Sequence, residues 1–147
     1  MQRTRVKICG FTSAEQAAHA ADAGVDAIGL VFYPPSPRHI SIAVAQEITT
    51  ALPAFTSVVA LFVDASEKDI RQVIEQVPID LLQFHGDESP EDCRRYNKPY
   101  MKVIRMQAHT DIKALSQQYH DAKALLLDAY HPQTKGGTGE KFNWELI

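Results

Sequence analysis

The sequence has few of the features that mark a secreted, membrane-spanning or metal-binding protein. Its 147 residues include two cysteines, Cys9 and Cys93, which are too few for a disulfide framework and lack the spacing of a zinc site. No apolar run approaches the roughly 18 residues that a transmembrane helix needs. The polar N-terminal stretch contains no signal-peptide core. We therefore expect a cytoplasmic protein with reduced thiols.

The sequence also lacks a strong charge bias and a nucleotide-binding glycine motif. Fifteen basic side chains stand against eighteen acidic ones, a net charge of -3, and no Lys/Arg cluster suggests a nucleic-acid or anionic-membrane surface. Neither the first predicted turn, CGFT, nor the glycine-rich stretch KGGTGEK matches a dinucleotide or P-loop pattern. The apolar content of 45% and the charged content of 22% are typical of a globular protein, and we predict one domain over residues 1–147.

Short β-branched runs alternate with helical patterns along the whole chain. The runs start about 20 to 30 residues apart, which is the span of a strand plus a crossover helix. Several runs are almost continuously apolar, as in parallel strands covered by helices. The predicted strands are Arg5–Cys9, Ala27–Val31, Thr56–Phe62, Leu81–Phe84, Tyr100–Arg105 and Ala124–Asp128.

Capping residues mark the ends of the helical patterns between these strands. Ser13, Ser66, Ser89 and Thr110 are the predicted N-caps, and Gly24 is placed where the first helix must stop. Six βα units fit either a doubly wound open sheet or part of a (β/α)8 barrel, which usually needs 200 residues or more. In both architectures the active site lies at the carboxyl ends of the strands.

The strand ends supply a short set of reactive side chains. They are Cys9, Arg38, Asp64, His85, Arg105 and Asp128. Cys9 is either a small buried apolar residue or a thiolate that needs a positive group nearby. Asp128 either caps the following loop or is partly desolvated and can donate a proton. Arg38, in the proline-rich loop FYPPSPRHI, is either solvated or grips a carboxylate or phosphate.

The His85 region is a weak candidate for a metal site. The cluster His85, Asp87 and Glu88 has no second histidine at helical spacing, so we expect no bound metal. A substrate contact by Gln83 or His85 is the better interpretation. The stretch KGGTGEK, residues 135–141, is interpreted as a loop over a site.

Four motifs together resemble the phosphoribosylanthranilate isomerase family of tryptophan biosynthesis. They are VKICGFT, GLVFYPPSPRHIS, LLQFHGDE and LLLDAYHPQTKGGTGEKFNW, which occur in the family's order at the ends of predicted strands. The resemblance implies an α/β protein with a (β/α)8 TIM barrel, of which this chain has about six βα units. It also implies an Amadori rearrangement of a phosphorylated small molecule, N-(5-phosphoribosyl)anthranilate, by general acid and base catalysis without a cofactor.

The resemblance also assigns roles to individual residues. Asp128 matches the family's general acid, Cys9 its general base, and Arg38 the arginine that holds the anthranilate carboxylate. Gln83 and His85 match substrate-lining positions. Gly136 and Gly137 match the loop that folds over the substrate.

The last two strands of such a barrel, with the phosphate-binding loops, are expected beyond Ile147. We therefore expect little activity from the 147-residue chain alone, and self-association through the open edges of the first and sixth strands. An alternative is an inactive six-unit remnant that binds a ligand or partner. A third, weaker interpretation is a hydrolase that uses Cys9 and His85.

Overall fold

The computed structural model describes residues 3–129 of the chain. They form six strands with a helix after each of the first five. The strands are β1 (Lys7–Cys9), β2 (Ala27–Val31), β3 (Ser57–Phe62), β4 (Leu81–Phe84), β5 (Tyr100–Met106) and β6 (Ala124–Ala129). The helices are α1 (Ala14–Asp22), α2 (Ile42–Thr50), α3 (Glu67–Gln76), α4 (Pro90–Arg94) and α5 (Ile112–Gln118). All six predicted strands are confirmed, with small shifts at their ends.

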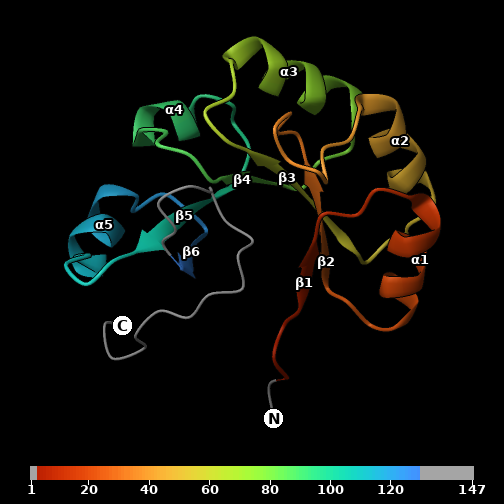
Figure 1. The fold of residues 1–147 in the computed structure, drawn as a ribbon, viewed down its shortest axis with the longest axis horizontal. Coiled ribbons are helices and arrows are strands. Elements are labelled where there is room, and N and C mark those ends of the chain that lie inside the picture. The colour runs from red at the N-terminus through yellow and green to blue at the C-terminus, as the bar shows by residue number, and fades with distance from the viewer. Residues whose placement is uncertain (1–2, 130–147) are drawn as a thin grey trace.

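The six strands form one sheet in which every strand is parallel to the next. Their order is β1-β2-β3-β4-β5-β6, so each strand pairs with its neighbours along the chain. A doubly wound sheet reverses its strand order at a switch point. That architecture is therefore excluded, and the consecutive order is that of a (β/α) barrel wall. Figure 1 shows the helices arranged in an arc outside the sheet.

Alternate side chains of each strand pack on opposite faces of the sheet. On β2, Ile28 and Leu30 belong to the main core beneath the helices, whereas Val31 belongs to a second cluster. The second cluster also contains Leu61 and Val63 of the β3 region and has the partly buried Cys9 packed against it. The period-2 geometry of a strand thus places Cys9 on the inner face, away from the helices.

Most of the predicted helix ends are confirmed. The side chains of Ser13 and Ser66 each accept a hydrogen bond from the backbone N–H three residues later. Ser89 makes a complete capping box with Asp92, and a proline follows it at the first helical position. Gly24 follows α1 with φ +93°, a conformation that favours glycine.

The predicted N-cap of the fifth helix is wrong by one residue. Asp111 is the N-cap of α5, and its carboxylate accepts a hydrogen bond from the backbone N–H of Ala114. The Thr110 hydroxyl instead accepts from the N–H of Gln107 and closes the preceding turn. Thr110 and Asp111 can each cap a helix, and the sequence does not show which of the two the helix uses.

Among residues 3–129, none of the helices has the length and apolar character of a membrane span.

Candidate active site

The carboxyl ends of the parallel strands bring several of the predicted side chains to one rim of the sheet. Cys9 is the last residue of β1, His85 directly follows β4, and Asp128 is the penultimate residue of β6. Arg105 of β5 lies opposite Asp128 in the strand register. Within the described residues, two separate groups of contacts form at this rim.

The first group joins β4 to β6 through a histidine. His85 Nε2 lies 3.1 Å from Asp128 Oδ2, and Gln83 Nε2 lies 3.3 Å from His85 Nδ1. The His85 side chain is 10% exposed, whereas that of Asp128 is 27% exposed and remains accessible from the rim. The buried Gln83 Oε1 has no hydrogen-bond partner among residues 3–129. The three side chains form a chain from the sheet interior to the rim.

Burial lowers the pKa of His85 below its usual value of 6.5, even though the hydrogen bond with Asp128 opposes this shift. His85 is therefore a neutral imidazole at neutral pH, with one N–H. Since Gln83 donates to Nδ1, that N–H is on Nε2 and points at the Asp128 carboxyl group.

The second group surrounds Cys9. Gly29 lies beneath the thiol, since a Cβ at this position would fall 2.5 Å from Cys9 Sγ. Gly10, with φ +95°, lies beneath Arg38, since its Cβ would fall 2.5 Å from Arg38 Cδ. Arg38 also donates from Nη1 to the backbone carbonyl of Cys9 at 3.1 Å. Gly29 of β2 therefore leaves room for the Cys9 thiol, and Gly10 leaves room for the Arg38 guanidinium group over the end of β1.

The structure does not join His85 to Cys9. Both ring nitrogens of His85 are engaged, one by Gln83 and the other by Asp128. A Cys–His hydrolase needs a direct hydrogen bond between thiol and imidazole. That interpretation has no support within residues 3–129.

A buried ion pair beside the site escaped the sequence analysis. Lys102 Nζ lies 2.9 Å from Glu88 Oε2, and both side chains are almost fully buried. Glu88 also accepts hydrogen bonds from the backbone N–H groups of Asp64 and Gly86, while Lys102 donates to the Gly86 carbonyl. The pair holds together the loops after β3 and β4. A lysine inside the apolar run YMKVIR was the signal that could have indicated a buried partner.

The remaining strand-end candidates have structural contacts. Asp64 Oδ1 accepts a hydrogen bond from the backbone N–H of Asp87 at 2.6 Å, and Arg105 makes an ion pair with Asp87. No group of three or more His, Cys, Asp or Glu side chains within residues 3–129 could hold a metal ion. Gly136 and Gly137 lie outside the described residues.

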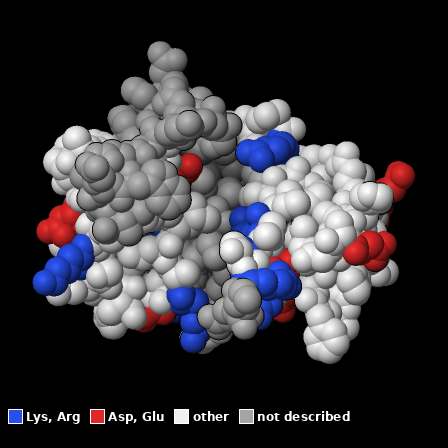
Figure 2. Space-filling model, turned by 90° about the horizontal axis from the view of Figure 1, so that it is seen from below, with Lys and Arg blue, Asp and Glu red and all other residues white. Residues whose placement is uncertain are grey.

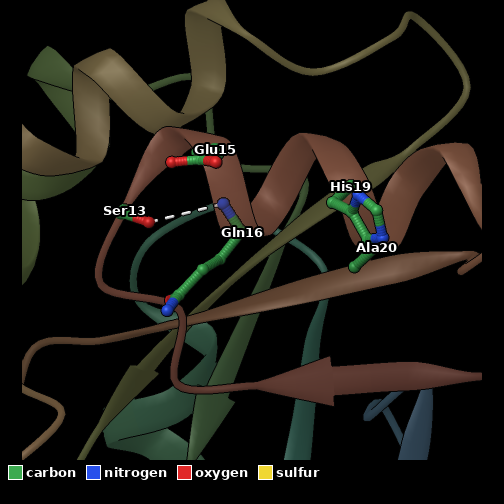
Figure 3. Close-up of a pocket in the computed structure, with 5 residues that line it drawn as sticks. All are labelled: Ser13, Glu15, Gln16, His19 and Ala20. Carbon is green, nitrogen blue, oxygen red and sulfur yellow. Dashed lines mark hydrogen bonds between the residues drawn. The ribbon is translucent and has the colours of Figure 1, made fainter.

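Two hollows of the described residues lie along α1 and α3, apart from these groups. One hollow lies along α1 and is lined by Ser13, Glu15, Gln16, His19 and Ala20 (Figure 3). Since α1 packs on the helix-covered side of the sheet, this hollow is remote from the inner face that carries Cys9. Figure 2 shows basic and acidic side chains interspersed on one face of the molecule, in keeping with the small net charge.

Known proteins resemble this chain over its whole length. Residues 6–147 match the model of the N-(5'phosphoribosyl)anthranilate (PRA) isomerase family. The N-(5'-phosphoribosyl)anthranilate isomerase of Neisseria meningitidis serogroup A is 54% identical over 147 residues, which are 100% of this chain and 71% of that protein. The corresponding protein of Azotobacter vinelandii is 50% identical over 147 residues, which are again 100% of this chain and 71% of that protein.

Solved structures agree with these sequence matches. The phosphoribosyl anthranilate isomerase of Thermotoga maritima superimposes with a TM-score of 0.88 and 36% identity, over 99% of this chain and 70% of that chain. A phosphoribosyl anthranilate isomerase in complex with reduced 1-(o-carboxyphenylamino)-1-deoxyribulose 5-phosphate superimposes with a TM-score of 0.79 and 35% identity, over 87% of this chain and 66% of that chain. The family match, the identities and the strand order agree: the chain belongs to the N-(5'-phosphoribosyl)anthranilate isomerase family and has the fold of its (β/α)8 barrel, of which six strands are described.

Proposed function

We propose that this chain carries the acid and base groups that convert N-(5'-phosphoribosyl)anthranilate to 1-(o-carboxyphenylamino)-1-deoxyribulose 5-phosphate, with Asp128 as the general acid and Cys9 as the general base. One observation carries the proposal: Asp128 stands at the carboxyl end of β6, where a neutral His85 holds it while the carboxyl group remains accessible. Cys9 ends β1 at the same rim and faces inward.

The rearrangement needs two positioned proton transfers. Asp128 gives a proton to the furanose oxygen as the anthranilate nitrogen forms a Schiff base and the ring opens. Cys9 then removes the proton from C2 of the sugar, and the resulting enolamine becomes the ketone. Each positioned transfer typically contributes about 10²- to 10⁴-fold to the rate. The nitrogen of the substrate accepts the electrons, so these steps require no cofactor.

Arg38 is suited to hold the carboxylate of the substrate. Its Nη1 donates to the Cys9 carbonyl, and the other N–H groups of the guanidinium fork can bind a carboxylate. This arrangement would place the carboxylate beside the base. Gln83 of β4 and His85, which follows it, line the proposed site, and Gly136 and Gly137 are proposed to contact the substrate.

The test compares the chain itself with a chain of the relatives' full length. Residues 1–147 are fused in register to the part of the Neisseria meningitidis protein that the match leaves out, and turnover is followed by the loss of substrate fluorescence. We expect turnover by the fusion and much less by the 147-residue chain. Cys9→Ala and Asp128→Ala should each lower kcat of the fusion at least about 10²-fold with little change in KM. Near-normal kcat in either variant would refute the role of that residue.

We also propose that residues 1–147 belong to one barrel domain, that this domain self-associates through its strand edges, and that it acts in the cytoplasm. Val6 and Ile8 are each 43% exposed at the β1 edge, which supports association. Both cysteines are free, which suits a reducing compartment. The alternative of an inactive binding remnant predicts a well-behaved dimer of the 147-residue chain with cooperative melting in size-exclusion chromatography with light scattering, whereas a soluble aggregate would count against it.

A further inference from the structure

We propose that His85 is a positioning residue that determines which oxygen of the Asp128 carboxyl group carries the proton delivered to the substrate. This inference rests on the proposed role of Asp128 as the general acid. In this proposal His85 makes a hydrogen bond with Oδ2 of Asp128, and Oδ1 takes up and releases the proton.

The hydrogen-bond directions along the chain of three side chains support this assignment. Gln83 donates its amide N–H to His85 Nδ1 at 3.3 Å, so the single ring proton of a neutral imidazole is on Nε2. Nε2–H then donates to Asp128 Oδ2 at 3.1 Å. The opposite orientation of Gln83 would place the ring proton on Nδ1 and set the Nε2 lone pair against a carboxylate oxygen. That arrangement is repulsive whenever Asp128 is ionised.

The surroundings keep the imidazole in this one form. His85 is buried, and desolvation is the largest influence on its protonation. Lys102 also disfavours a second ring proton, whereas Asp128 and Glu88 favour one. Glu88 already has Lys102 as its partner at 2.9 Å. The ring therefore remains a donor on one side and an acceptor on the other.

The chemical consequence follows from the two kinds of oxygen in a protonated carboxyl group. Its carbonyl oxygen accepts hydrogen bonds and its hydroxyl donates one. Because Oδ2 already accepts from Nε2–H, the proton is placed on Oδ1, which makes no hydrogen bond with the residues that the structure describes. In ring opening the Oδ1–H bond breaks, its electron pair stays on Oδ1, and the proton binds the furanose oxygen. The carboxylate that forms keeps its bond from Nε2–H, so no proton moves on His85.

The first test is the tautomer of His85 in the 147-residue chain. With ¹⁵N-labelled histidine, NMR should show the Nε2–H form, with the His85 signal identified by its loss in His85→Gln. Gln83→Glu replaces the donor by a carboxylate and should bring a proton to Nδ1, whereas Gln83→Met should not. An Nδ1–H tautomer in the unsubstituted chain overturns the proposal, and that spectrum remains decisive if a Gln83 variant fails to fold.

The second test uses the fusion protein described above. His85→Leu should lower kcat about 10- to 100-fold with KM changed less than about threefold, since a displaced acid misses the transition state. His85→Gln keeps an N–H that can reach Oδ2 and should recover most of kcat. A raised KM with normal kcat would instead make His85 a substrate contact and overturn the proposal. If the unsubstituted fusion has no turnover, the proposed function fails. The NMR measurement of the His85 tautomer does not depend on turnover, so it still tests whether His85 donates to Asp128.

Discussion

The Cys9 thiol differs from the other cysteine in its exposure and its surroundings. Cys9 is partly exposed on the inner face, whereas Cys93 is a fully buried residue of α4, and burial raises its pKa to about 12. The thiolate is the reactive form. We predict that iodoacetamide at neutral pH modifies Cys9 in the folded protein and leaves Cys93 unmodified, as measured by peptide mass spectrometry. Equal modification of both cysteines in folded protein would contradict this packing.

Gly29 is predicted to be essential for the position of that thiol. In Gly29→Ala the new Cβ would fall 2.5 Å from Cys9 Sγ, so the thiol or the strand must move. We expect kcat of the fusion to fall about 10- to 100-fold and the free energy of unfolding to fall by about 1–3 kcal/mol. The matched control is Gly24→Ala, whose Cβ meets no atom within 4 Å. It should cost about 1–2 kcal/mol through its positive φ and leave turnover unchanged.

The lowered pKa of His85 makes stability depend on pH in a defined direction. Between its lowered folded pKa and the ordinary value of 6.5, the unfolded chain binds more protons than the folded one. The contribution of His85 to stability is therefore complete above pH 6.5 and is lost as the pH falls through the folded pKa. Urea unfolding at pH 7.5 and 5.5 should show a smaller loss for His85→Gln than for the unsubstituted protein. An equal loss of stability in both proteins would show that His85 does not cause this pH dependence.

At the scale of elements, the loops after β3 and β4 depend on one buried ion pair. Lys102→Met would leave the Glu88 carboxylate buried with backbone N–H donors but without its cation. Removal of one partner of a buried pair typically costs about 3–5 kcal/mol. We expect that loss in urea unfolding, together with lower kcat in the fusion because His85 directly precedes Gly86 in the tethered loop.

Two variants separate the charge of this pair from its packing. Lys102→Met combined with Glu88→Gln removes both charges and keeps an oxygen for the backbone donors, so it should recover part of the lost stability. Arg94→Met breaks only exposed pairs with Glu91 and Asp121 and should cost about 0–1 kcal/mol. If Lys102→Met cost no more than Arg94→Met, the buried pair would not stabilise the loops.

At the scale of the whole molecule, the outer edge of β1 is predicted to drive association. Among the described strands β1 pairs with β2 alone, and Ile8 is 43% exposed there. Ile8→Lys should therefore shift the protein toward monomer in size-exclusion chromatography with light scattering. Phe55→Lys is the control, since Phe55 is fully exposed but lies in the loop before β3. A monomer before substitution, or an equal effect of both variants, would contradict the role of this edge.

The strands, most helix caps and the candidate residues at the strand ends follow from local sequence patterns alone. Apolar period, capping and glycine signals act over a few residues, so Leu81–Phe84 and the caps Ser13, Ser66 and Ser89 could be predicted without the fold. Thr110 shows the limit of this reasoning, since Asp111 beside it has equal capping chemistry and is the residue used.

Which of these residues meet depends on how the strands are arranged in three dimensions. His85 and Asp128 are 43 positions apart in sequence, and Lys102 and Glu88 are 14 positions apart on different elements. These contacts follow from strand register and sheet curvature, which the whole set of strand pairings determines. Local sequence patterns contain no such long-range information. Local patterns place acid, base and cation at the strand ends. The arrangement of the strands in the sheet brings His85 to Asp128 and places Gly29 beside the Cys9 thiol.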